Sequence, residues 1–119
     1  MPVSPKLAAI VIDCADPVKL AEFYRLATGW EITHADADSA QLSDGGAVGL
    51  SLQRIDGYQG PGWPDDAKHC HLDLTSSDVD ESVRALLAAG AVKPDFQPGG
   101  ADWTVLADPE GHLVCVCAE

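Results

Sequence analysis

Residues 7–17 read LAAIVIDCADP, a short apolar run that ends in polar residues. The run from Leu7 to Ile12 is rich in branched side chains and predicts a buried strand. Asp16 and Pro17 predict the start of a helix, because the aspartate can accept an N–H of the first turn and proline has no N–H to leave unbonded. The segment therefore predicts a strand that leads directly into a helix.

The rest of the chain predicts the same unit twice. Gly29 stands where the first helix should end, since glycine readily adopts the left-handed conformation of a helix terminus. After a loop rich in glycine and proline, a new strand begins at His71, and a helix is expected between Asp78 and Gly90. Three strand-like pieces follow each helix; they cover 31–34, 40–42 and 48–53 in the first half and 92–96, 103–106 and 113–117 in the second. This recurrence predicts an internal duplication.

The 119 residues are expected to form one α+β domain, 1–119, made of two βαβββ modules. Module one is predicted over about 7–54, the linker loop over about 55–67 and module two over about 68–118. A sheet with one helix leaves its other face uncovered. Two such curved mixed sheets are therefore expected to enclose a central cleft, which is the natural place for a ligand.

Composition narrows the class of partner. Nineteen acidic and seven basic side chains give a formal charge of −12, which excludes nucleic acid as a partner and favours neutral or cationic small ligands. No apolar run approaches the roughly 20 residues that cross a bilayer, so no membrane partner is expected. The first residues show no signal peptide, and a core of this size does not need disulfides. These observations predict a cytoplasmic protein with reduced cysteines.

Three stretches carry a resemblance to a known family: 12–17, 71–74 and 106–112. The last, LADPEGH, looks like an Asp-Pro-x-Gly-Asn turn before a final strand. Together they resemble the vicinal oxygen chelate superfamily, in its glyoxalase, bleomycin-resistance and extradiol dioxygenase group. The resemblance implies the two-module fold over nearly the whole chain, and it makes a homodimer plausible, because similar proteins often dimerise.

The resemblance also implies where metal ligands would stand. Metal-dependent members offer one ligand from the first strand and one from the last strand of each module. The corresponding positions here are Ala9, then Ser51 or Gln53 (we favour Gln53), then His71 and Cys115. Because alanine cannot coordinate, the resemblance implies a reduced set that would hold zinc, nickel or iron only with non-standard ligands. No cofactor is the expected state.

The histidines and cysteines of module two leave three interpretations open. His69 and His71 share one strand face, as do Cys115 and Cys117, and the four side chains could form a zinc site. Alternatively, His71 is hydrogen-bonded and both cysteines are packed. The third interpretation is a reactive thiol at Cys115 beside His71.

Aromatic and acidic side chains complete the candidate binding site. Trp63 lies in the glycine- and proline-rich loop, where an exposed tryptophan indicates a ligand lid or a partner subunit. Trp30 and Trp103 are either apolar walls for a planar or cationic ligand or fillers of the core and sheet edge. Asp73 shares the face of His71, where it would bind a ligand amine, orient His71 or stand exposed at the rim.

These residues favour a small-molecule-binding protein of the glyoxalase/bleomycin-resistance type that needs no metal. Its expected ligand contacts are Trp30, Gln53, Trp63, His71, Asp73, Trp103 and Cys115. The alternative is a glyoxalase-like lyase, isomerase or dioxygenase-type enzyme. It would use a divalent metal on His71, Cys115 and Gln53, or metal-free acid–base catalysis by His71.

Overall fold

The computed structural model describes residues 6–60 and 70–119 and has two strand–helix–strand modules. Both modules begin with a strand that leads into a helix, as predicted. In chain order the elements are β1 (Ala9–Cys14), α1 (Pro17–Thr28), β2 (Glu31–Ala35), β3 (Ser39–Ser43), β4 (Gly49–Arg54), β5 (Leu72–Ser76), α2 (Val79–Ala88), β6 (Trp103–Ala107) and β7 (Leu113–Ala118). The α+β class and the two modules with mixed sheets are confirmed.

The helix boundaries follow from local chemistry. Asp16 accepts a hydrogen bond from the backbone N–H of Lys19 at 3.2 Å, and Pro17 is the first residue of α1. Gly29 ends α1 with φ 72° and donates its N–H to the carbonyl of Arg25. Asp78 caps α2 in the same way as Asp16 caps α1. The predicted N-caps are therefore present in both modules; α2 has Ala89 as its C-cap, and Gly90 follows it with φ 111°.

Module one has a four-stranded mixed sheet in the order β1-β4-β3-β2. β1 runs parallel to β4, and the other neighbours are antiparallel. Leu50 and Leu52 of β4 and Leu42 of β3 are buried against α1, whereas the alternate residues Ser51 and Gln53 face away from the helix. One face of this sheet is thus covered by α1, and the other carries polar side chains such as Ser51 and Gln53 together with the exposed Val11.

Module two has a three-stranded sheet in the order β5-β7-β6. The strand predicted over 92–96 is reduced to a single bridge between Val92 and Ala107. Pro94 cannot donate a backbone hydrogen bond, which removes one ladder position. Instead the side-chain amide of Gln97 donates to the carbonyl of Val105 at 2.9 Å and accepts from its N–H at 2.8 Å. A side chain therefore occupies the place of a fourth strand.

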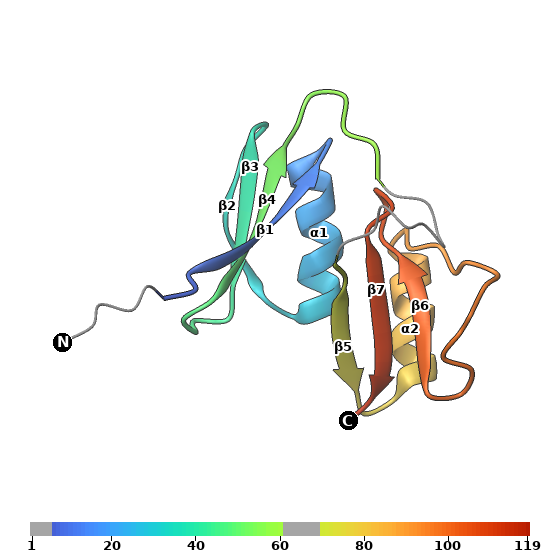
Figure 1. Ribbon diagram of the computed structural model, residues 1–119. Helices are drawn as coiled ribbons and strands as arrows, with labels where there is room; N and C mark the ends of the chain where they lie inside the picture. The colour runs from blue at the N-terminus through green and yellow to red at the C-terminus, as the bar shows by residue number, and fades with distance from the viewer. Residues whose placement is uncertain (1–5, 61–69) are drawn as a thin grey trace.

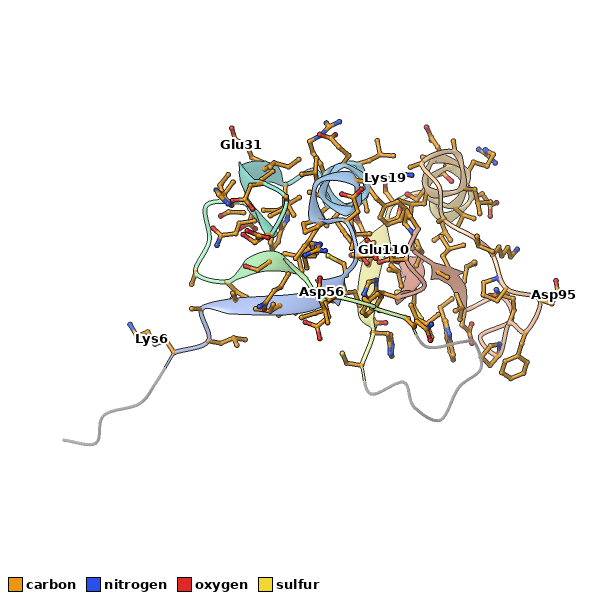
Figure 2. All side chains as sticks on the ribbon, turned by 90° about the horizontal axis from the view of Figure 1, so that it is seen from above. Lys6, Lys19, Glu31, Asp56, Asp95 and Glu110 are labelled. Atoms are coloured by element: carbon orange, nitrogen blue, oxygen red, sulfur yellow. The ribbon has the colours of Figure 1, made fainter. Side chains whose placement is uncertain are left out.

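Figure 1 shows α1 between the two sheets and α2 against the sheet of module two. Viewed from above, both helices lie on the same side of the molecule (Figure 2). One core contains residues of both modules, among them Leu20, Tyr24, Leu52, Leu106 and Val116. No helix among the described residues is long and apolar enough to cross a membrane.

Candidate functional site

The uncovered face of the module-two sheet carries the side chains that could bind a ligand or take part in a reaction. Leu74, Val114 and Val116 point toward α2, so the alternate residues point the other way. The strand registers place Asp73 opposite Cys115, and Cys115 opposite Val105. These three residues form one row across the sheet.

A groove of about 400 Å³ lies over this face. Its apolar wall contains Trp103, which is 40% exposed, together with Val105 and Leu113. The described lining residues, all from module two, are His71, Asp73, Pro98, Trp103, Val105, Leu113, Cys115 and Cys117. A volume in this range with mostly apolar walls and a few polar groups is typical of a small-molecule site.

The polar end of the groove is a cluster of three side chains. Nε2 of His71 lies 3.0 Å from Oδ1 of Asp73. One donor atom from each of His71, Asp73 and Cys115 lies within 4.8 Å of the other two. The side chains of His71 and Asp73 are 39% and 70% exposed, so solvent and ligands reach the cluster.

The donor atoms of this cluster can be compared with the ligands that a metal ion requires. It offers one imidazole nitrogen, one carboxylate oxygen and one thiol sulfur, which are the three donor types that zinc accepts. Zinc holds nitrogen and sulfur at about 2.0–2.3 Å, so the three atoms would move slightly closer together around an ion. The residues therefore fit a divalent metal as three ligands of an open site, and Asp73 is the ligand that the sequence analysis did not include.

The structure brings together some of the predicted ligand contacts and separates others. His71, Asp73, Trp103 and Cys115 all line the groove. Gln53 lies in module one, where it pairs in register with Asp13 and is exposed, and it is not among the lining residues. The indole of Trp30 packs against the core, which is the second of the two roles considered for it. Trp63 and His69 lie outside the described residues.

A buried polar network that the sequence analysis missed joins the two modules. Asp108 is 2% exposed, and its carboxylate accepts a hydrogen bond from the hydroxyl of Tyr24 at 2.7 Å. The same carboxylate lies 2.6 Å from Nδ1 of His112, whose Nε2 contacts the hydroxyl of Tyr58 at 2.8 Å. Nε2 of His112 also contacts the carbonyl of Asp13 in β1. His112 therefore makes a local contact with Asp108 and also reaches module one.

The network shifts the protonation equilibria of its members. Burial raises the pKa of Tyr24 far above its ordinary value, and the charge of Asp108 raises it further. Burial raises the pKa of Tyr58 to about 12, with Asp108 and Glu110 adding to the shift. Burial alone would lower the pKa of His112, but its hydrogen bond to Asp108 and the charge of that carboxylate outweigh this effect and raise it.

Glu110 makes a second connection between the modules. Its carboxylate accepts hydrogen bonds from the backbone N–H groups of Ala15 and Asp16, the latter at 2.9 Å. These two residues form the turn between β1 and α1. Figure 2 shows Glu110 near the middle of the molecule, far from the labelled Lys6 and Asp95 at its two ends. The turn at 108–112 thus holds the two modules together, whereas the described residues that line the groove belong to module two.

Solved structures with the same fold have little sequence identity to this chain. A possible glyoxalase from Bacillus cereus is 18% identical, with a TM-score of 0.71 over 97% of this chain and 100% of that one. The fosfomycin resistance protein FosX from Listeria monocytogenes, solved with Mn(II) and dihydroxypropylphosphonic acid, is 17% identical, with a TM-score of 0.72 over 98% and 94% of the two chains. A glyoxalase family protein from Enterococcus faecalis is 18% identical, with a TM-score of 0.68 over 94% and 96%. At this identity the similarity establishes the fold alone.

No curated protein sequence matches the chain. The sequence pattern of one family, described as the glyoxalase-like domain, matches residues 9–117. This match spans both modules and agrees with the solved structures. The chain therefore belongs to the glyoxalase-like domain family of the vicinal oxygen chelate superfamily.

Proposed function

We propose that the protein binds a small molecule in the groove of module two and that binding requires no metal. The observation that carries this proposal is the groove itself, which combines an apolar wall with a polar cluster at one end. Ligand sites of this kind fix orientation through a few polar groups and gain affinity from apolar walls. All four cysteines are thiols, which fits the cytoplasmic location that we also propose.

The groove favours a planar ligand that carries a positive charge. The half-exposed indole of Trp103 offers a flat surface for stacking, and the exposed carboxylate of Asp73 would pair with a cation. The net charge of −12 attracts cations to the protein as a whole. A planar aromatic cation therefore matches both the wall and the polar end of the groove.

Binding of such a cation can be measured by titration calorimetry with proflavine as the probe. We expect Trp103→Ala and Asp73→Asn each to weaken binding by about tenfold, because each removes a contact worth about 1–2 kcal/mol. Asp102→Asn is the matched control, since Asp102 is an exposed carboxylate next to Trp103 but outside the lining of the groove. Equal affinities for all four proteins would refute the proposed site.

The second candidate function is a metal-dependent or acid–base enzyme, and the cluster of His71, Asp73 and Cys115 favours it. A structural relative, FosX, was solved with Mn(II). A divalent metal would supply Lewis-acid chemistry at the polar end of the groove. Without a metal, His71 could accept a proton while Asp73 holds its ring.

Elemental analysis of the calorimetry samples distinguishes these functions. A metal-independent binder keeps its affinity for proflavine after dialysis against EDTA and contains no stoichiometric metal. Zinc, nickel, iron or manganese bound at one ion per chain, and lost in His71→Ala, would overturn metal independence and favour the enzyme.

We also propose that the protein is a homodimer, with β1 at the contact between copies. Ile10 and Val11 of β1, on opposite faces of the strand, are 44% and 54% exposed, and Leu7, just before the strand, is 66% exposed. β1 is also an edge strand. Neighbouring exposed apolar side chains on an unpaired edge favour association with a second copy of the chain.

Analytical ultracentrifugation tests the dimer. We expect a mass of two chains for the wild type and of one chain for Val11→Lys, because a lysine at the contact would have to be buried without a partner. Val18→Lys is the matched control, since Val18 is 46% exposed on α1, away from β1. A wild-type monomer at micromolar concentration would contradict the proposal.

A further inference from the structure

We propose that Cys115 is a nucleophile that captures a soft carbon electrophile bound in the groove. His71 would accept the thiol proton, and Asp73 would hold the imidazole in place. This inference goes beyond the proposed function, because it assigns to the same groove a second class of ligand, which binds covalently. That class is the conjugated, planar α,β-unsaturated carbonyl compounds.

The fold itself brings the three groups together. The parallel register of β5 and β7 places Asp73 directly opposite Cys115. His71 lies two residues before Asp73, on the same face, and its Nε2 is 3.0 Å from Oδ1 of Asp73. The Cys115 sulfur lies within 4.8 Å of donor atoms on both residues. A thiol, an imidazole and a carboxylate grouped in this way are the parts from which an activated nucleophile is built, and the contact between thiol and base is often loose before a ligand binds.

Comparison with Cys14 shows what a packed cysteine looks like in this molecule. Cys14 is fully buried and donates from its sulfur to the carbonyl of Gln53. Burial raises its pKa to about 11, with further contributions from surrounding carboxylates, so this thiol is inert. Cys115 instead lines the groove and is partly exposed. Of these two cysteines, Cys115 is the one whose sulfur a small electrophile can reach.

The residues that line the groove also indicate which class of electrophile would bind there. Val105, next to Cys115 in the sheet, and Trp103 form an apolar wall beside the sulfur. Such a wall favours a flat conjugated carbon skeleton. Conjugation of an alkene with a carbonyl makes its β-carbon electrophilic, and a thiolate is the side-chain nucleophile that reacts with it most readily.

The reaction balances without any oxidant or reductant. His71 takes the proton of the Cys115 thiol, and the sulfur electron pair forms a bond to the β-carbon of the alkene. The π electrons of the C=C bond move toward the carbonyl and form an enolate. The imidazolium of His71 then returns its proton to the α-carbon, which leaves a thioether and a neutral imidazole.

The other cysteine of the groove is a matched internal control. Cys117 lies on the same strand and the same face, is also partly exposed, and lines the same groove. Its neighbour in the register is Thr75, whereas that of Cys115 is Asp73. The two thiols therefore share surroundings and differ in access to the His71–Asp73 pair.

The test compares two proteins, each with one groove thiol. Cys70→Ser/Cys117→Ser keeps Cys115, and Cys70→Ser/Cys115→Ser keeps Cys117; both retain the buried Cys14. The probe is N-ethylmaleimide, and intact-mass spectrometry gives the rate of adduct formation at pH 7. We expect Cys115 to react at least about tenfold faster than Cys117, because Cys115 is the one that lies opposite Asp73 and beside His71. Equal rates would overturn the inference.

Variants of the pair separate an activating role from a structural one. In the protein that keeps Cys115, His71→Gln and Asp73→Asn should each slow labelling by about tenfold, to about the rate of Cys117. The same substitutions should leave the rate of Cys117 unchanged. His34→Gln is the control, because His34 forms a similar pair with Asp36 at 2.9 Å in module one. A Cys115 rate that is insensitive to His71→Gln would refute the role of the imidazole.

The inference and the proposed function can fail separately. If proflavine binds with the expected dependence on Trp103 while Cys115 shows no excess reactivity, the groove is a binding site and the thiol chemistry is refuted. If Cys115 is activated but proflavine does not bind, the proposal of a cationic ligand is refuted. The reactivity of Cys115 is then still supported by the labelling rates.

Discussion

Asp108→Ala is expected to lower the free energy of unfolding by about 3–5 kcal/mol, the usual cost of removing one partner of a buried charged pair. The substitution would leave the hydroxyl of Tyr24, a fully buried residue, without its acceptor and the ring of His112 without its carboxylate. It would also remove the acceptor for the backbone N–H groups of Glu110 and His112. Urea denaturation followed by circular dichroism measures the loss.

Asp95→Ala is the matched control for this substitution. Asp95 is exposed and belongs to the same module, so its replacement should change stability by less than about 0.5 kcal/mol. A loss below about 1 kcal/mol for Asp108→Ala would show that the network does not stabilise the contact between the modules.

Alkaline pH is expected to destabilise the protein steeply. Burial and nearby carboxylates raise the pKa of Cys14 from 9.0 to about 11 and raise that of Tyr24 far above 10.0. Between the unfolded and folded values, the native state keeps protons that the unfolded chain releases. The stability that these two groups contribute is therefore full below pH 9 and falls as pH rises, by about 1.4 kcal/mol per pH unit for each group between its unfolded and folded pKa. From pH 9 to 11 the two groups together should remove about 3 kcal/mol.

The measurement is the urea midpoint and unfolding free energy at intervals between pH 7 and 11. Tyr24→Phe removes one of the titrating groups, so its decline above pH 10 should be shallower than that of the wild type by about 1.4 kcal/mol per pH unit. General repulsion among acidic residues acts equally in both proteins and cancels in the comparison. If Tyr24→Phe declines as steeply as the wild type, the buried hydroxyl does not control the alkaline transition.

The fold was largely predictable because its signals are local. Asp16 and Gly29 specify the ends of α1 through their own side chain or backbone conformation. The run from Leu7 to Ile12 was expected to be a buried strand, but β1 lies at the edge of its sheet with Ile10 and Val11 exposed, because an apolar run does not reveal a strand's place in the sheet. The error at 92–96 has the same origin, because a run of plausible strand residues does not reveal that Gln97 will bond the edge of β6 in place of a backbone.

The candidate site was predictable within one module but not between modules. His71, Asp73 and Cys115 fall together because strand parity and the order of β5 and β7 determine their positions. Whether Gln53 reaches the groove depends on how the sheet of module one lies relative to that of module two. The alternation of side chains along a strand contains no information about this arrangement. The predicted cleft between the sheets is accordingly a groove lined by described residues of one sheet.

The network around Asp108 was missed for a different reason. Asp-Pro-Glu-Gly at 108–111 was interpreted as a turn, which it is, since the N–H of Gly111 bonds to the carbonyl of Asp108. Its side-chain contact with Tyr24 joins residues distant in sequence, and only the folded arrangement of α1 and β6 shows it. A buried aromatic hydroxyl on a helix was the available signal, because such a group needs a partner.

The amide of Gln97 has a consequence for self-association by strand addition. An exposed sheet margin offers peptide groups to which any extended segment of another molecule can attach, and this is how many β proteins polymerise. At β6 the peptide group of Val105 is already occupied by Gln97. The β6 edge of module two therefore has the peptide groups of Val105 and Ala107 already bonded, which hinders the addition of a foreign strand at this edge.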